Sequence, residues 1–162
     1  MKTLIVYASK YGTTRDCAIR LQELLGPDAD LANLNEAPKT DVSGYDRVVI
    51  GSPLYMGKLQ KSVRNFCKRN CAELLDKRVA FFICGFSEKD EAMKLLTGQV
   101  PDELLDSAAA IGHFGGEVRA EKAKSIDKFF LKKVQEDDSL HYAIDPAAIE
   151  ALCEAIGRES QP

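Results

Sequence analysis

Four short apolar runs divide the chain, and each ends in small or polar residues that open a loop. They cover residues 3–8, 47–51, 79–85 and, more weakly, 108–115. Continuous β-prone apolar runs of this length are typical of strands that are buried on both faces. Residues 28–34 supply a shorter extra strand, so five strands are expected.

Helical patterns fill the intervals, over residues 14–25, 61–75, 91–96, 102–107 and 147–156. Gly98 and Pro101 break the third helical region, and Asp145-Pro146 is typical of an N-cap followed by the first helical residue. Strands that alternate with helices require crossover connections over a parallel sheet. The sequence therefore predicts an α/β fold with a doubly wound five-stranded parallel sheet and helices on both faces, formed as a single domain by residues 1–162.

Ligands of such sheets bind beyond the carboxyl ends of the strands, so the loops after the strands are the informative ones. The first loop consists of Ser9, Lys10, Tyr11, Gly12, Thr13 and Thr14. Amides at a helix N-terminus and nearby hydroxyls favour an anion, and a glycine allows close approach. The loop lacks the Lys-Ser/Thr ending of a triphosphate loop and the three-glycine dinucleotide fingerprint, which favours a phosphate monoester over ATP or NAD. The alternative is an ordinary turn capped by Thr13 or Thr14.

At Ser9, Gly12 and Thr14 this loop matches the phosphate loop of the flavodoxin family, which the chain resembles from residue 1 to about 158. Tyr11 stands where that family usually has Ser or Thr, and Thr13 where Asn is frequent. The resemblance implies the strand order 2-1-3-4-5 and an FMN cofactor whose phosphate is bound by residues 9–14.

The resemblance also implies that two further loops surround the flavin ring. The second loop offers Pro53, Leu54, Tyr55, Met56, Gly57 and Lys58, and the third offers Gly85, Phe86 and Ser87. Leu54, Tyr55 or Met56 would form an aromatic or apolar wall, and the Gly57-Lys58 peptide would exchange hydrogen bonds with the flavin. Phe86 is expected either to stack on the ring or to cover the core.

A narrower similarity concerns residues 45–52, followed by Gly57, and residues 126–133. Both segments resemble the menaquinone-dependent protoporphyrinogen dehydrogenases of the flavodoxin type. An FMN-dependent oxidoreductase is therefore an alternative to a plain electron-transfer protein. The basic and aromatic residues between 124 and 134 are typical of a core-facing helix more often than of a membrane-contacting one.

Composition restricts the partners and the cellular compartment that are expected for this protein. The net charge of -3 gives no reason to expect nucleic-acid binding, and no apolar run is long enough to span a bilayer. Five scattered cysteines and the absence of a visible export signal favour reduced thiols in the cytoplasm. We expect Cys84 to be the thiol to test for redox sensitivity, and Cys67 and Cys71 to be inert.

These observations predict a protein whose chemistry occurs on FMN, without a catalytic side chain or a metal, and whose partner is a redox protein or a small-molecule electron donor or acceptor. A cofactor-free signalling module on the same architecture is a further alternative. Receiver modules of that kind need an acidic cluster after the first strand, where this chain has Ala8 and Ser9.

Overall fold

The computed structural model describes residues 1–116 and 143–158. Within these ranges the strands are β1 (Thr3–Tyr7), β2 (Ala29–Asn33), β3 (Arg47–Tyr55), β4 (Lys58–Leu59), β5 (Arg78–Cys84) and β6 (Ala110–His113). The helices are α1 (Thr13–Leu25), α2 (Lys61–Arg69), α3 (Cys71–Leu75), α4 (Lys89–Leu96), α5 (Asp102–Ser107) and α7 (Pro146–Gly157). The parallel strands follow the order β2-β1-β3-β5-β6, and β4 pairs antiparallel with β3.

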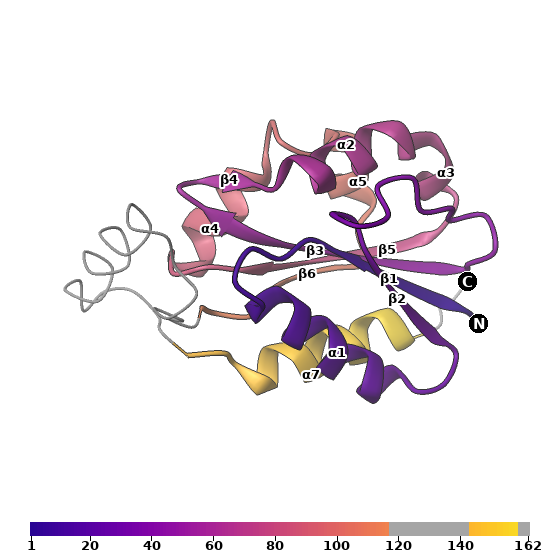
Figure 1. Ribbon diagram of the computed structural model, residues 1–162, viewed down its shortest axis with the longest axis horizontal. Coiled ribbons are helices and arrows are strands. Elements are labelled where there is room, and N and C mark those ends of the chain that lie inside the picture. Colours follow the sequence, from indigo (N-terminus) through magenta and orange to yellow (C-terminus); the bar gives the residue numbers. More distant parts are fainter. Residues whose placement is uncertain (117–142, 159–162) are drawn as a thin grey trace.

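The sheet is covered on both faces, with α1 and α7 on one side and α2 to α5 on the other (Figure 1). Successive strand residues point to opposite faces, so Leu4 and Val6 pack in one core while Ile5 and Tyr7 pack in the other. All five residues of β1 are buried. This burial explains why the strands appear in the sequence as continuous apolar runs.

The expected doubly wound α/β fold and the order of its five parallel strands are confirmed, but the sheet has a sixth strand, the short β4, where a loop was expected. The final helix also begins as expected, because the Asp145 carboxylate accepts hydrogen bonds from the amides of Ala147 and Ala148 at 3.0 and 3.3 Å. None of the helices in residues 1–116 and 143–158 has the length and hydrophobicity that a bilayer span requires. The segment 126–133, compared above with the dehydrogenases, lies outside the described residues.

Two expectations were wrong in detail. The helix expected over residues 61–75 is two helices, because Asn70 ends α2 and its side-chain amide donates to the Phe66 carbonyl at 3.0 Å. Asparagine competes for backbone groups in this way and is unfavourable inside helices. The strand expected to end at Gly51 continues to Tyr55, so most of the second loop is strand.

The strand order places the topological switch point between β1 and β3. The chain leaves β1 to form β2 on one side and then returns to form β3 on the other side of β1. The crevice that such a reversal opens lies at the carboxyl ends of these strands. The residues that follow β1, β3 and β5 therefore meet at one edge of the sheet.

Candidate functional site

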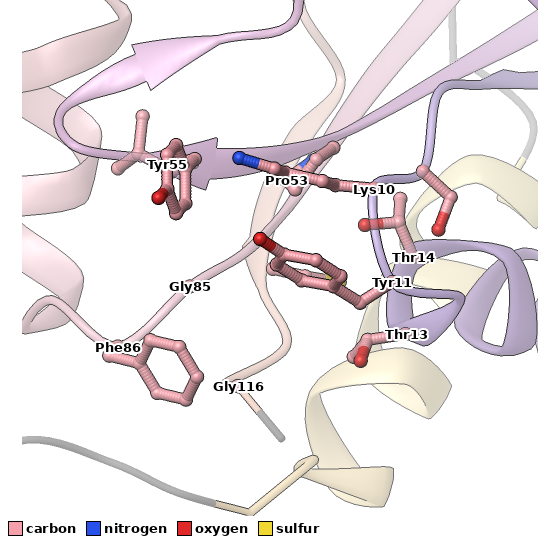
Figure 2. Close-up of a pocket in the computed structure, with 12 residues that line it drawn as sticks. Lys10, Tyr11, Thr13, Thr14, Pro53, Tyr55, Gly85, Phe86 and Gly116 are labelled. Carbon is pink, nitrogen blue, oxygen red and sulfur yellow. The ribbon is translucent and has the colours of Figure 1, made fainter. Parts of the chain in front are cut away.

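A pocket lies at this edge, and we call it the switch-point pocket. Its lining residues are Ser9, Lys10, Tyr11, Thr13, Thr14, Pro53, Leu54, Tyr55, Cys84, Gly85, Phe86 and Gly116. Figure 2 shows these side chains converging from the loop after β1, the end of β3 and the end of β5. Together with Gly116, which follows β6, four segments that are distant in the sequence thus form one site.

The loop after β1 turns tightly into α1. Gly12 is the N-cap residue with a φ of 94°, a left-handed conformation that favours glycine, and its amide donates to the Ser9 hydroxyl at 3.0 Å. Among the described residues no side chain caps this helix. The first amides of α1, including those of Thr13 and Thr14, lack acceptors within the helix and carry the positive end of its dipole. This is the arrangement that binds a phosphate group.

The side chains of Lys10 and Tyr11 reach from this loop over the pocket. The Lys10 ammonium lies 3.3 Å from the centre of the Tyr55 ring and 5.3 Å from that of the Tyr11 ring. Figure 2 shows the Tyr11 ring extending into the middle of the pocket, with the Lys10 ammonium directed at Tyr55. The contact between Lys10 and Tyr55 ties the loop after β1 to the end of β3.

The second predicted loop is a β-hairpin. Pro53, Leu54 and Tyr55 belong to β3 and line the pocket, whereas Met56 and Gly57 form the two-residue turn that leads into β4. Both turn residues have positive φ, 51° and 75°, as the turns of two-residue hairpins require. A loop was expected over these residues because proline and glycine, here Pro53 and Gly57, are typical of loops.

The hairpin directs Met56, Gly57 and Lys58 away from the lining of the switch-point pocket. The Gly57 carbonyl accepts a hydrogen bond from Gln99 Nε2, and the Leu59 amide donates to Gln99 Oε1, each at 2.9 Å. Met56 and Lys58 instead line a second cavity, the hairpin groove, whose lining residues are Lys10, Tyr55, Met56, Lys58, Leu59, Gln60 and Arg64. The two cavities share Lys10 and Tyr55.

The third wall follows β5. Gly85 and Phe86 line the switch-point pocket as the sequence suggested, but Ser87 does not. Gly116 also lines the pocket and was not predicted, although Gly115 and Gly116 stand at the end of the fourth apolar run, where a loop beside the site begins. A Cβ atom at Gly116 would lie 2.7 Å from the Phe86 ring, so only glycine fits here without displacing that ring.

The Cys84 thiol lies at the base of this pocket and is buried. Its hydrogen bond with the Cys17 thiol and its burial raise the pKa of Cys84 well above the ordinary thiol range, while a hydrogen bond from the Thr14 hydroxyl opposes this. Burial likewise raises the pKa of Cys67 to about 12. Because the thiolate is the reactive form, this burial lowers the reactivity expected of Cys84 at neutral pH, and its redox sensitivity stays a prediction.

The donor set and the walls of the switch-point pocket fit a flavin mononucleotide. An uncapped helix N-terminus with hydroxyl side chains suits its phosphate, and the Tyr55 and Phe86 rings suit a flat aromatic system. With the Tyr11 ring inside, the pocket has only about 50 Å³ of open space, against the several hundred that ligand pockets usually offer. The Tyr11 ring takes up the middle of this space (Figure 2).

Comparisons with known proteins agree with this geometry. The model of the flavodoxin domain family matches residues 4–141. The chain is 30% identical over 145 residues to the protoporphyrinogen IX dehydrogenase [quinone] of Escherichia coli, covering 83% of this chain and 78% of that one. It is 31% identical over 146 residues to flavodoxin 1 of Salmonella typhimurium, covering 84% and 82%.

Among solved structures, the flavodoxin of Streptococcus pneumoniae TIGR4 shares the fold, with a TM-score of 0.55 and 20% identity, over 96% of this chain and 95% of the other. The family model thus matches most of the chain, and the two curated relatives are at least 30% identical to it over more than four-fifths of its length. The protein therefore belongs to the flavodoxin domain family.

Proposed function

We propose that this chain is an FMN-binding redox protein with a flavodoxin-like fold. The observation that carries the proposal is the meeting, in one pocket, of an uncapped helix N-terminus and two aromatic walls. Bound FMN supplies reversible electron transfer, and the protein supplies binding, orientation and control of the potential. Membership of the flavodoxin domain family supports this function over a cofactor-free signalling module.

The lining residues divide between the two parts of the cofactor. The amides of Thr13 and Thr14 and the hydroxyls of the loop after β1 would hold the phosphate. Tyr55 and Phe86 would contact the ring, and Tyr11 would leave the centre of the pocket to admit it. Ser87 and Gly57 have no assigned contact, because neither lines the pocket.

The first test compares FMN with riboflavin, which lacks the phosphate. We expect FMN to quench its fluorescence on binding and to bind at least about tenfold more tightly than riboflavin, since hydrogen bonds to a charged group contribute about 1.5–3 kcal/mol. Equal affinities for FMN and riboflavin would show that the loop after β1 does not bind the phosphate. A protein that binds neither flavin would refute the redox function.

Within this function the leading candidate is an electron-transfer protein that works with a redox partner or a small-molecule donor or acceptor. A second candidate is an FMN-dependent oxidoreductase, favoured by the similarity to the Escherichia coli dehydrogenase over 83% of the chain. An anaerobic reductive titration followed by absorbance separates them. Two resolved one-electron steps favour the carrier, and a single two-electron step favours the enzyme.

We also propose that residues 1–162 form one domain and that the protein works in the cytoplasm. All five cysteines lie in the described residues and are free thiols, as suits a reducing compartment. The net charge of -3 gives no support for a nucleic-acid partner. Limited proteolysis tests the first point, and fractionation of the source cells tests the second.

A further inference from the structure

The hairpin groove has a larger volume than the switch-point pocket beside it. Its volume is about 620 Å³, within the range of small-molecule sites. Lys10 and Tyr55 line both cavities, so a molecule in the groove would be separated from the flavin site by these two side chains. Figure 2 shows Lys10 and Tyr55 together along one side of the switch-point pocket.

The charged side chains that line the groove are all cationic. Lys10, Lys58 and Arg64 line it, and no aspartate or glutamate among residues 1–116 and 143–158 does so. Helix α2 begins beside it at Lys61, with no acidic residue in its first turn and no capping side chain among the described residues. The positive end of this helix dipole therefore adds to the charge of the three side chains. The groove is an electropositive hollow in a chain whose net charge is negative.

Arg64 is the most enclosed of the three cations. Its side chain is half-buried, whereas Lys10 and Lys58 are exposed, and its Nε atom is buried without a hydrogen-bond partner among the described residues. Within residues 1–116 and 143–158, neither Arg64 nor Lys58 forms an ion pair with a carboxylate. A buried guanidinium nitrogen without a partner is unfavourable, and an anionic ligand would satisfy it.

Apart from Gln60, the rest of the described lining is apolar or aromatic. Met56 is 67% exposed at the tip of the hairpin, and Leu59 and Tyr55 complete the wall. The hairpin holds Met56 at this tip with a φ of 51°, and Gln99 fixes the next residues through the Gly57 carbonyl and the Leu59 amide. A free inorganic anion would leave this apolar surface uncovered, whereas an organic anion would bury it.

We propose that the hairpin groove is a binding site for a small organic anion, a carboxylate on an apolar or aromatic body, separated from the flavin site by Lys10 and Tyr55. The site rests on the proposed redox function and adds the chemical class of a ligand that binds beside the flavin. Arg64 and Lys58 pair with the carboxylate, and Met56, Leu59 and Tyr55 contact the body.

The test titrates FMN-loaded protein by isothermal calorimetry with 2-naphthoate and with its neutral analogue 2-naphthamide. We expect the naphthoate to bind at least about tenfold more tightly than the amide, and Arg64→Gln to weaken naphthoate binding by about tenfold, as loss of a hydrogen-bonded charge partner predicts. Lys58→Gln should weaken it by a smaller factor because Lys58 is exposed. Lys68→Gln, an exposed change of the same charge in the last turn of α2, should leave it unchanged.

Three outcomes would overturn the site: naphthoate fails to bind wild-type protein, the amide binds equally well, or Lys68→Gln weakens binding as much as Arg64→Gln. Circular dichroism of each variant verifies that it is folded, and Lys58→Gln repeats the test if Arg64→Gln is not. Arg64 and Lys58 do not line the switch-point pocket. If the protein binds no FMN, the redox proposal fails, and the dependence of naphthoate binding on Arg64 still decides the anion site.

Discussion

The loop after β1 and the hairpin after β3 occupy neighbouring edges of the same site, yet they are built differently. The loop is shaped locally, by Gly12 at a φ of 94° and by the Ser9 hydroxyl three residues away. The hairpin is shaped from a distance, because Gln99 holds its turn from 42 and 40 residues further along the chain. One region follows from its own residues, and the other depends on the assembled fold.

This difference teaches where a sequence motif is informative. An anion site at a helix N-terminus needs only a short segment with free backbone amides and a glycine, so its residues appear side by side in the sequence. The wall of a ring pocket needs side chains at positions that the sheet fixes. The hairpin therefore places Tyr55 in the pocket and the next three residues, Met56, Gly57 and Lys58, outside its lining.

The largest effect is expected from a substitution in β3, the central strand that leads into the hairpin and pairs with β1. A Cβ atom at Gly51 would lie 2.0 Å from Cζ of the buried Phe82 ring, which itself stacks on Phe114 at 4.7 Å. Gly51→Ala should lower the free energy of unfolding by about 2–3 kcal/mol, measured by urea denaturation. Gly44→Ala is the control, because a Cβ there meets no atom within 4 Å. Equal stability of the two variants would show that β3 can shift without cost.

A matched pair of glycine variants separates the two regions directly. Gly12 and Gly57 both have positive φ, 94° and 75°, so alanine at either position should lower the unfolding free energy by about 1–2 kcal/mol. Only Gly12→Ala should also weaken FMN binding, by about tenfold or more, because it alone distorts the helix N-terminus. Fluorescence titration with oxidised FMN measures this. A larger loss of affinity in Gly57→Ala would place the hairpin turn at the cofactor.

A smaller effect concerns the distant contact that shapes the hairpin. Gln99→Leu removes the hydrogen bonds to the Gly57 carbonyl and from the Leu59 amide, and should lower the unfolding free energy by about 1–2 kcal/mol. Hydrogen exchange at the Leu59 amide should become faster, while exchange at Val6 in β1 should change no more than global stability requires. If the Leu59 amide keeps its protection, the hairpin is shaped locally after all.

The smallest effect tests how tightly the base of the pocket is packed. The folded-state pKa of Cys84 is raised, so the folded protein keeps this proton at a pH where the unfolded chain, with a pKa of about 8.5, loses it. The resulting stability is present below that value and is lost as pH rises above it. Between pH 7.5 and 9.5 wild-type protein should lose about 1 kcal/mol more than Cys84→Ala in urea denaturation. Parallel curves would mean that the thiol is accessible to solvent.

Much of the fold was predictable because strands that are buried on both faces of a parallel sheet appear in the sequence as continuous apolar runs. The apolar runs gave the strands, and Asp145-Pro146 gave the start of the last helix. The split at Asn70 and the extension of β3 to Tyr55 were not predictable from periodicity, since a helical pattern continues through Asn70 and Pro53 is ordinarily a loop signal.

The sequence by itself indicated the buried strands and, through its resemblance to the flavodoxin family, their order. It also placed the residues predicted to bind a phosphate, 9–14, side by side, because an anion site at a helix N-terminus needs only a contiguous segment. The tertiary structure decided that Tyr55 faces the pocket while Met56 and Lys58 line the hairpin groove, that Gly116 completes the wall, and that Cys84 is buried. These properties depend on which segments the sheet brings together and on how far each side chain is removed from water. Neither the pairing of distant segments nor the burial of a single side chain can be predicted from the spacing of residues along the chain.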